Sequence, residues 1–161
     1  MKYTFGVMTQ EQAEEIAYHW HYEGKHSFYD MEADQEDLAE FLDSNMRGET
    51  TFAVCKNGEM IGFFSINRAD LHTVDVGLGM KPNMTGNGLG LKFLREGLAF
   101  CERAYQPKYV TLSVATFNER AIKVYKKAGF EAVGTFIQGT NGSRFEFLKM
   151  MYHTACREYK I

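Results

Sequence analysis

The sequence lacks the long apolar runs, the basic excess and the paired cysteines that mark several classes of protein. No apolar stretch approaches the ~18 residues that a membrane-spanning helix needs, so none is predicted. The opening residues MKYTFGVMTQ have no apolar core of the kind found in signal peptides, and we expect no secretory leader. The formal net charge of -3 argues against a broad nucleic-acid surface, because such a surface needs Lys and Arg to neutralise phosphates.

The three cysteines lack the spacing of a disulfide framework or a metal site. Cys55, Cys101 and Cys156 are odd in number, far apart and without C-x-x-C spacing. They predict reduced thiols that fill the core of a cytoplasmic protein. The pair His19 and His21 predicts no metal site, because side chains two residues apart on a helix diverge by about 200°.

What remains is the composition of a single soluble globular domain. The chain has 161 residues, of which 45% are hydrophobic and 24% are charged. That length suffices for one sizeable core and is short for two. No repeat, low-complexity tract or linker-like stretch interrupts it, so residues 1–161 predict one domain.

Apolar periodicity and turn residues predict the elements of the first half of the chain. Residues 2–8 predict a strand and residues 10–22 a helix, and Asp34 is placed to cap the start of a second helix. Two β-branched and aromatic runs flank Asn57-Gly58, which is a strong hairpin signal. A further strand is expected over 73–80.

In the second half, a glycine segment leads into a long helix with an apolar stripe on one face. A strand follows over 108–115, then a helix capped by Asn118 and ended by Gly129. Strands over 131–137 and 144–151 meet at a turn at Asn141-Gly142. The order β-α-α-β-β-β-α-β-α-β-β indicates an α/β (mixed α+β) domain with helices on both sides of one sheet.

The glycine segment KPNMTGNGLGLKFL predicts an anion cradle. Gly86, Gly88 and Gly90 stand where a strand gives way to a helix, and glycines allow backbone N–H groups to approach a phosphate at the helix start. A glycine-rich turn that merely begins a helix explains the pattern equally well. It is not the dinucleotide fingerprint, because Leu91 replaces the third glycine, and no P-loop Lys-Ser/Thr follows.

The stretch NERAIKVYKKAGF decides between these readings. Its residues Asn118, Ala121, Tyr125 and Gly129-Phe130 follow the pattern N-x-x-A-x-x-x-Y-x-x-x-G-F. Together with the glycine loop about thirty residues earlier, it resembles the GNAT family of N-acetyltransferases, over about residues 74–151. The family loop usually opens on Gln or Arg, where this chain has Thr85. The resemblance implies a mostly antiparallel twisted sheet of six to seven strands, flanked by about four helices.

The resemblance further implies acetyl-CoA as the co-substrate and no metal. Its pyrophosphate would lie on the amides around residues 86–91, and the end of the preceding strand would offer backbone groups to the pantetheine arm. The cofactor-binding residues implied in this way are Leu78, Met80, Thr85, Gly86, Asn87, Gly88, Leu89, Gly90, Leu91, Asn118 and Tyr125.

For catalysis, the resemblance gives Tyr125 the role of general acid toward the CoA thiolate. A tyrosine in the core of an amphipathic helix is the alternative, and Asn118 is also explained as a plain helix cap. Asp75 stands where related enzymes often carry an acidic residue that relays a proton from the amine, although an outward-facing strand residue is as good an explanation. His72 is better explained as a loop histidine than as a base.

The acceptor side is predicted from the connection between the first two helices. There Phe28 and Tyr29 are candidate pocket residues, unless they dock against the core, and nearby carboxylates would attract a cationic amine. We therefore expect an N-acetyltransferase that acts on a small-molecule amine or a protein N-terminus, without nucleic-acid or membrane partners. A non-catalytic acyl-CoA-binding sensor on the same fold is the alternative, and a homodimer stays open.

Overall fold

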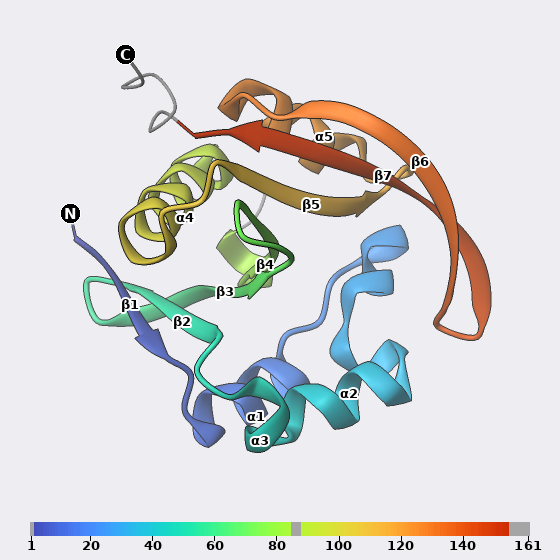
Figure 1. Ribbon diagram of the computed structural model, residues 1–161. Helices are drawn as coiled ribbons and strands as arrows, with labels where there is room; N and C mark the ends of the chain where they lie inside the picture. The colour runs from blue at the N-terminus through green and yellow to red at the C-terminus, as the bar shows by residue number, and fades with distance from the viewer. Residues whose placement is uncertain (1, 85–87, 155–161) are drawn as a thin grey trace, which may run out of the picture. The chain divides into compact units, whose positions relative to one another are not determined.

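The computed structural model describes residues 2–84 and 88–154. Its strands form one sheet in the order β1-β2-β3-β4-β5-β7-β6 (Figure 1). The strands are β1 (Tyr3–Val7), β2 (Thr51–Lys56), β3 (Glu59–Arg68), β4 (Thr73–Met80), β5 (Tyr109–Ala115), β6 (Glu131–Thr140) and β7 (Ser143–His153). The helices are α1 (Gln10–His19), α2 (Gln35–Leu42), α3 (Ser44–Arg47), α4 (Leu89–Tyr105) and α5 (Glu119–Ala128), and the 3-10 turns are η1 (Gly24–Tyr29), η2 (Met31–Ala33) and η3 (Pro82–Met84).

The predicted mixed α/β class and element order are confirmed. Strands β1 and β2 pair antiparallel, as do β5 and β7, whereas β4 and β5 run parallel. Two of these three pairings are antiparallel, in agreement with the mostly antiparallel sheet that was expected. The helices α1, α2, α4 and α5 are the four that the sequence predicts, and α3 and the 3-10 turns are additional.

Two predicted boundaries are wrong. The first helix ends at His19 rather than residue 22, because Trp20 is extended at φ -95° and ψ 107° and its indole is buried. The last two strands are longer than the predicted 131–137 and 144–151, because β6 continues to Thr140 and β7 begins at Ser143. Asn141 and Gly142 close the hairpin as a two-residue loop with φ 51° and 75°. Helix α3 has no counterpart among the predicted elements, although Asp43 caps it and Gly48 ends it.

The chain divides into two compact units. Unit 1 comprises Met1–Phe64, Leu78–Thr85 and Gly139–Phe145, and unit 2 comprises Ser65–Gly77, Gly86–Gln138 and Glu146–Ile161. The strands β3, β4, β6 and β7 each contribute residues to both units. The single domain over residues 1–161 stays a prediction.

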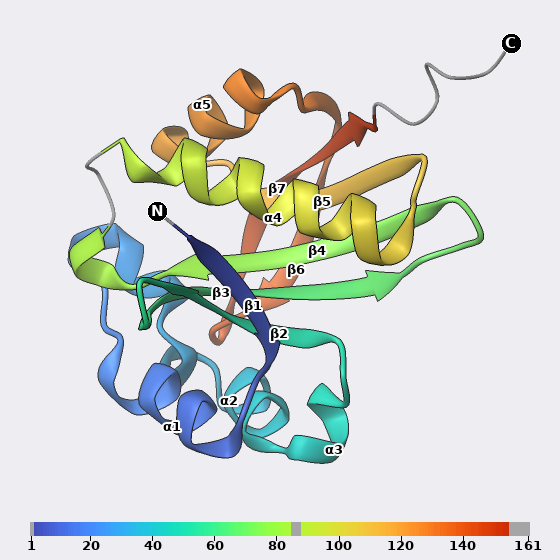
Figure 2. The same cartoon turned by 90° about the vertical axis from the view of Figure 1, so that its left-hand side faces the viewer.

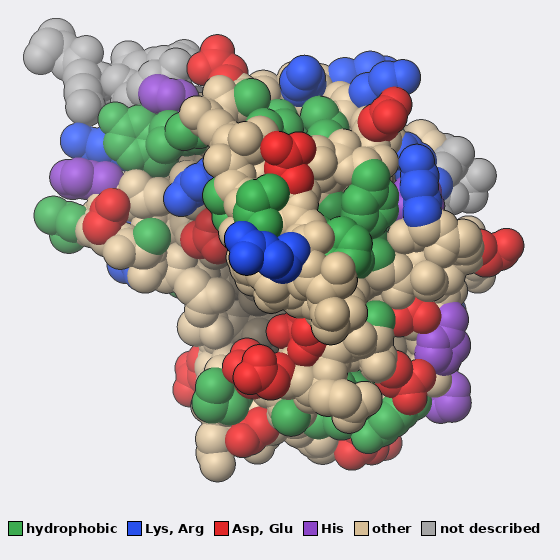
Figure 3. All heavy atoms as spheres, turned by 90° about the vertical axis from the view of Figure 1, so that its right-hand side faces the viewer, with side chains coloured by type: hydrophobic (Ala, Val, Ile, Leu, Met, Phe, Trp, Pro, Cys, Tyr) green, Lys and Arg blue, Asp and Glu red, His purple; other side chains and the backbone are tan. Residues whose placement is uncertain are grey.

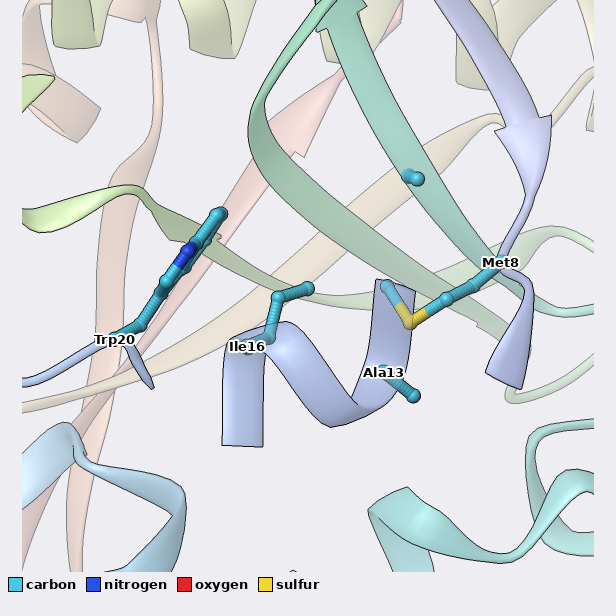
Figure 4. Packing of buried hydrophobic residues seen from close by; sticks show 5 residues of the cluster. Met8, Ala13, Ile16 and Trp20 are labelled. Carbon is cyan, nitrogen blue, oxygen red and sulfur yellow. The ribbon is translucent and has the colours of Figure 1, made fainter. Parts of the chain in front are cut away.

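In unit 1, helix α1 packs its apolar face on the strands. Ala13, Ile16 and Trp20 are buried together with Met8 and Ala53. Figure 4 shows Ile16 projecting from α1, and Trp20 from the segment just after it, to the side of the strands. Thr9 fixes the start of α1 through a capping box with Gln12. Burial of this cluster holds the helical layer of unit 1 to β2.

In unit 2, helix α4 carries the predicted apolar stripe. Phe93, Leu94, Gly97, Leu98 and Cys101 are all buried, as their helical spacing predicts. Helices α4 and α5 lie side by side (Figure 2). Strand β5 lies between β4 and β7 in the sheet, and it pairs with β7 from Tyr109 against His153 to Ala115 against Phe147. Burial raises the pKa of the Cys101 thiol to about 12, which agrees with an inert core cysteine.

None of the helices within residues 2–84 and 88–154 is both long enough and apolar enough to cross a lipid bilayer.

A close backbone approach in β4 gives a test of this packing. A Cβ added to Gly79 would lie 2.6 Å from Cε1 of Phe63, whereas a Cβ at Gly6 in β1 meets no atom of the described residues within 4 Å. We expect Gly79→Ala to lower the free energy of unfolding by about 1–3 kcal/mol through overpacking, and Gly6→Ala to leave it within about 0.5 kcal/mol. Urea unfolding of both variants measures this. Equal effects would contradict the close fit of Gly79 against Phe63.

Candidate functional site

Helix α4 begins within the glycine segment, between its second glycine, Gly88, and its third, Gly90. Thr85, Gly86 and Asn87 lie outside the described residues. Gly88 is the N-cap and has φ 74°, a left-handed angle that glycine adopts without strain. It brings no side chain to the N–H groups of the first turn, and that turn contains no acidic residue. These donors lie at the positive end of the helix dipole and suit an anion.

The other long helices of the described chain do not share this feature. The side chains of Thr9, Asp34 and Asn118 each accept hydrogen bonds from the first turn of α1, α2 and α5. Only in α4 is the N-cap a glycine, among the four helices of eight or more residues in the described ranges. The start of α4 is therefore the place where a ligand would serve as the cap.

The two sequence motifs meet where α4 packs on α5. A Cβ placed on Gly90 would lie 3.8 and 3.9 Å from the two methyl groups of Val124, which is ordinary contact. Val124 immediately precedes Tyr125 in α5. The structure thus brings the glycine segment beside the helix that carries Tyr125. The backbone angle at position 88 is left-handed and favours glycine, whereas the angle at position 90 is not.

Helix α5 holds the two motif residues Asn118 and Tyr125 as predicted. Asn118 is buried, its backbone N–H donates to Ala115 O at 2.9 Å, and its Oδ1 accepts from Ala121 N at 3.3 Å. Tyr125 is half-buried two turns later, with its ring 5.9 Å from that of Phe130. Asn118 is thus a helix cap, and the partial exposure of Tyr125 leaves both explanations of that residue open.

Asp75 lies on β4 at the last rung that β4 shares with β5. The ladder pairs Thr73, Val74 and Asp75 with Tyr109, Val110 and Thr111. The buried hydroxyl of Thr111 donates to Oδ1 of Asp75 at 2.7 Å, and Asp75 itself is exposed. The carboxylate is therefore held in one orientation and still reaches solvent, which agrees with either predicted role.

The pairing of β4 with β5 covers these three residue pairs among the described residues. In that ladder of the described chain, Val76 and Gly77, which follow on β4, have no rung to β5. The printed pairing of β4 with β5 thus ends before Leu78 and Met80, the two residues of β4 predicted to bind the pantetheine arm.

The backbone groups of Leu78 and Met80 point away from β3. The N–H of Lys81 donates to Ile61 O on β3 at 2.8 Å, so the Met80 carbonyl in the same peptide plane points to the opposite edge. Leu78 shares this direction because successive residues alternate. The phenol of Tyr22 donates to the Met80 carbonyl at 2.6 Å. The Met80 carbonyl therefore already has a protein partner.

Tyr22 contacts the predicted site residue Met80, and the sequence pattern does not reveal this contact. The pattern places it on the first helix, but it lies beyond the end of α1, where its N–H donates to Oδ1 of Asp30 at 2.8 Å. Burial raises the pKa of its phenol well above the usual value. The phenol is therefore a proton donor that ties the segment after α1 to the end of β4. No local pattern marks this contact, because its partners are 58 residues apart.

Phe28 and Tyr29 lie at the end of η1 and are half-buried. Their rings meet edge-on with centroids 5.0 Å apart, and Phe28 also meets Phe145 of β7 at 4.7 Å. The pair docks on an aromatic neighbour and keeps part of its surface exposed. Both sequence explanations, a pocket wall and a docked pair, are therefore compatible with the structure.

Other candidates fall outside this set. His72 is an exposed loop residue whose carbonyl accepts from Lys108 and Tyr109 N–H. Within residues 2–84 and 88–154, no three His, Cys, Asp or Glu side chains are grouped to hold a metal ion. An open pocket of about 330 Å³ between α4, α5 and β7 contains none of the predicted site residues.

Comparison with known proteins points to one family. The family described as "Acetyltransferase (GNAT) domain" matches residues 4–131 of the chain. The chain is 29% identical over 92 residues to the L-amino acid N-acetyltransferase AaaT of Escherichia coli, a match that covers 55% of the chain and 57% of that protein. It is 32% identical over 85 residues to the N-alpha-acetyltransferase RimI of Mycobacterium tuberculosis, covering 48% and 49%.

These matches span only about half the length of the curated relatives. Among solved structures, that of AAC(6')-Ib in complex with ribostamycin and coenzyme A is similar with a TM-score of 0.74 and 20% identity. That similarity covers 99% of this chain and 98% of the other, and at this identity it shows the fold alone.

The buried phenol of Tyr22 predicts a dependence of stability on pH. Burial raises the pKa of the Tyr22 phenol in the folded protein. The phenol therefore contributes its full share to the free energy of unfolding below the unfolded pKa of about 10, and this share is lost as the pH rises above that value. At pH 8 we expect Tyr22→Phe to lower the free energy of unfolding by about 1 kcal/mol. Urea unfolding between pH 8 and 10.5 should show this difference shrinking. A difference that is constant with pH would contradict the buried phenol.

Proposed function

Because the chain belongs to the acetyltransferase (GNAT) domain family, we propose that it is an acetyl-CoA-dependent N-acetyltransferase that acts directly on a primary amine. One observation carries the proposal: α4 packs on α5 where a Cβ added to Gly90 would lie 3.8 Å from a methyl group of Val124. The start of α4, whose N-cap is the glycine Gly88, thereby adjoins the helix of Tyr125, so the proposed phosphate anchor and the proposed proton donor belong to the same unit.

The residues present fit the cofactor. Gly88 to Leu91 at the start of α4 offer backbone donors at the positive end of a helix, and Thr85, Gly86 and Asn87 precede them in the sequence. The N–H groups of Leu78 and Met80 face the edge of β4 away from β3 and would hold an extended arm. When bound, acetyl-CoA supplies the acetyl group as a thioester.

The charges of the two units support the same assignment. Unit 2, which contains the start of α4, has 12 basic and 8 acidic residues, a net charge of +4. Unit 1, which contains Phe28 and Tyr29, has 6 basic and 13 acidic residues, a net charge of -7. Acidic side chains gather over the helices of unit 1 in Figure 3. The positive charge of unit 2 favours a ligand that carries phosphates, and the negative charge of unit 1 favours a ligand that carries an ammonium group.

Two side chains of unit 2 would carry the proton transfers. The phenol of Tyr125 would hold a proton for a departing thiolate, whose usual pKa of about 8.5 makes a weak acid sufficient. The carboxylate of Asp75, oriented by the Thr111 hydroxyl, would take up a proton from the ammonium form of the acceptor. Asn118 would keep α5 in place as its cap.

The acceptor would be a cationic small-molecule amine or a protein N-terminus, bound by residues of unit 1. Phe28 and Tyr29 offer a partly exposed aromatic surface. The acidic residues Asp30 and Asp34 follow them closely in the sequence. The names of the relatives, an L-amino acid and an N-alpha-acetyltransferase, agree with an amine acceptor of this general class.

The cradle is tested by a matched pair of glycine substitutions. Gly88→Ala places a side chain at φ 74°, which costs about 1–2 kcal/mol, so re-orientation of the first amides should weaken coenzyme A binding about tenfold. Gly90→Ala fits against Val124 and should raise the free energy of unfolding by about 0.5–1 kcal/mol, with the affinity within about threefold. Calorimetric titration with coenzyme A measures both. Full affinity in Gly88→Ala would contradict the cradle.

The general acid is tested by Tyr125→Phe. With acetyl-CoA and a panel of amines, we expect kcat near neutral pH to fall about 100-fold, because the proton for the leaving thiolate is lost. The affinity for coenzyme A should hardly change. Tyr18→Phe, at an exposed position in α1, is the control and should match the parent protein. An unaffected kcat in Tyr125→Phe would remove the assigned role, and binding without turnover by the parent protein would indicate a sensor.

A further inference from the structure

The carboxylate of Asp34 joins two parts of unit 1 that are far apart in sequence. Its Oδ1 accepts from the N–H groups of Glu36 and Asp37 at 3.0 and 3.1 Å, which caps α2. Its Oδ2 accepts from the N–H of Asn141 at 2.8 Å and from Oγ1 of Thr140 at 3.1 Å. Oδ1 thus caps the start of α2, and Oδ2 accepts hydrogen bonds from the turn between β6 and β7.

The geometry of that turn explains why it needs a partner. Asn141 and Gly142 both have positive φ, the combination of a two-residue type I′ loop. In such a loop the ladder closes on the flanking residues Thr140 and Ser143, and the N–H of the first loop residue points outward. Asp34 supplies the missing acceptor from 107 positions away.

A second set of contacts ties the same turn to the segment before α2. The side-chain amide of Asn141 donates to the carbonyl of Phe28 at 2.9 Å. The ring of Phe28 meets the rings of Phe145 at 4.7 Å and of Tyr29 at 5.0 Å. The aromatic pair therefore lies on the turn from β6 to β7, with a hydrogen bond on one side and a ring contact on the other.

The segment is held on its other side by unit 1 itself: Asp30 accepts from the N–H of Tyr22 at 2.8 Å, and Met31 packs against the buried cluster around Ile16. The 3-10 turns η1 and η2, which make up Gly24–Tyr29 and Met31–Ala33 of the described chain, contain no buried residue. Short 3-10 turns are weak by themselves, so their shape depends on outside contacts. Hydrogen bonding to Asn141 lowers the pKa of the Asp34 carboxyl, which keeps it an ionised and strong acceptor.

We propose that Asp34 is a positioning residue: with Asn141 it locks residues 24–33 to the β6–β7 turn and so presents Phe28 and Tyr29 to the acceptor amine. This inference rests on the proposed function. A surface held before binding costs less to order when the acceptor arrives, so the lock acts on acceptor affinity. Asp34 itself need not touch the acceptor, the cofactor or the reacting atoms.

The substitution Asp34→Asn separates the two roles of the side chain. Asparagine caps helices as well as aspartate does, so its oxygen keeps α2 intact. Its amide nitrogen, in the place of Oδ2, cannot accept from the Asn141 N–H. With spermidine, L-phenylalanine and a hexapeptide with a free N-terminus as probes, we expect the acceptor KM to rise about tenfold for whichever probe is turned over. The kcat should stay within about twofold and the coenzyme A affinity unchanged.

The matched control is Asp43→Asn, because Asp43 caps α3 through Asn45 N–H in the same way. It should leave all three quantities unchanged. Asn141→Gly retains the left-handed angle and the backbone N–H for Asp34 but removes the bond to Phe28, and should raise the acceptor KM by a smaller factor. The proposal would be overturned if Asp34→Asn left the acceptor KM unchanged, or if its kcat fell by as large a factor as the KM rose.

Hydrogen exchange of the free protein distinguishes failure of the lock from failure of the proposed function. In Asp34→Asn, amide exchange should quicken at Asn141 and across residues 24–33, and not in α2. If the parent protein turns over no amine but this pattern appears, the proposed function fails and the lock stands. If the exchange of residues 24–33 is the same in both proteins, the lock is wrong whatever the activity.

Discussion

The packing of α4 on α5, at the level of Gly90 and Val124, is the constraint on which the candidate site of this protein depends. It sets the start of α4 beside α5 and leaves room in the first turn of α4, whose N-cap Gly88 offers no side chain. The long apolar stripe of α4, buried from Phe93 to Cys101, holds this arrangement in place. Core packing thus serves to present backbone donors at one end of a helix, where an anion is the natural partner.

The sequence predicts those features that depend on local chemistry. Asp34 and Asn118 accept at helix starts, Asn57-Gly58 and Asn141-Gly142 close hairpins, and Gly129 ends α5 at φ 112°. Each follows from a preference of one residue type for one backbone angle or one hydrogen bond. The family motifs add specificity, since two patterns in the right order on the right elements exclude most other anion cradles.

The features that the sequence does not predict are made by partners distant along the chain. Tyr22 reaches Met80, Thr111 reaches Asp75, and Asp34 reaches Asn141. No periodicity marks such pairs, because each needs the complete fold of its unit to bring the two residues together. The early end of α1 has the same cause: Trp20 is buried and Tyr22 is bonded in an extended segment, so tertiary contacts override the helical pattern. The sequence can therefore suggest candidate residues on strands and caps, whereas it does not reveal the residues that orient them.

The proposed function depends above all on the amides at the start of α4, which would bind the phosphates of coenzyme A. Amide NMR during titration with coenzyme A tests this most directly, because each N–H reports its own hydrogen bond. Binding at the helix start predicts that the amides of Gly88, Leu89 and Gly90 show the largest downfield shifts and become protected from exchange. Saturable binding that leaves these three amides unperturbed would contradict it.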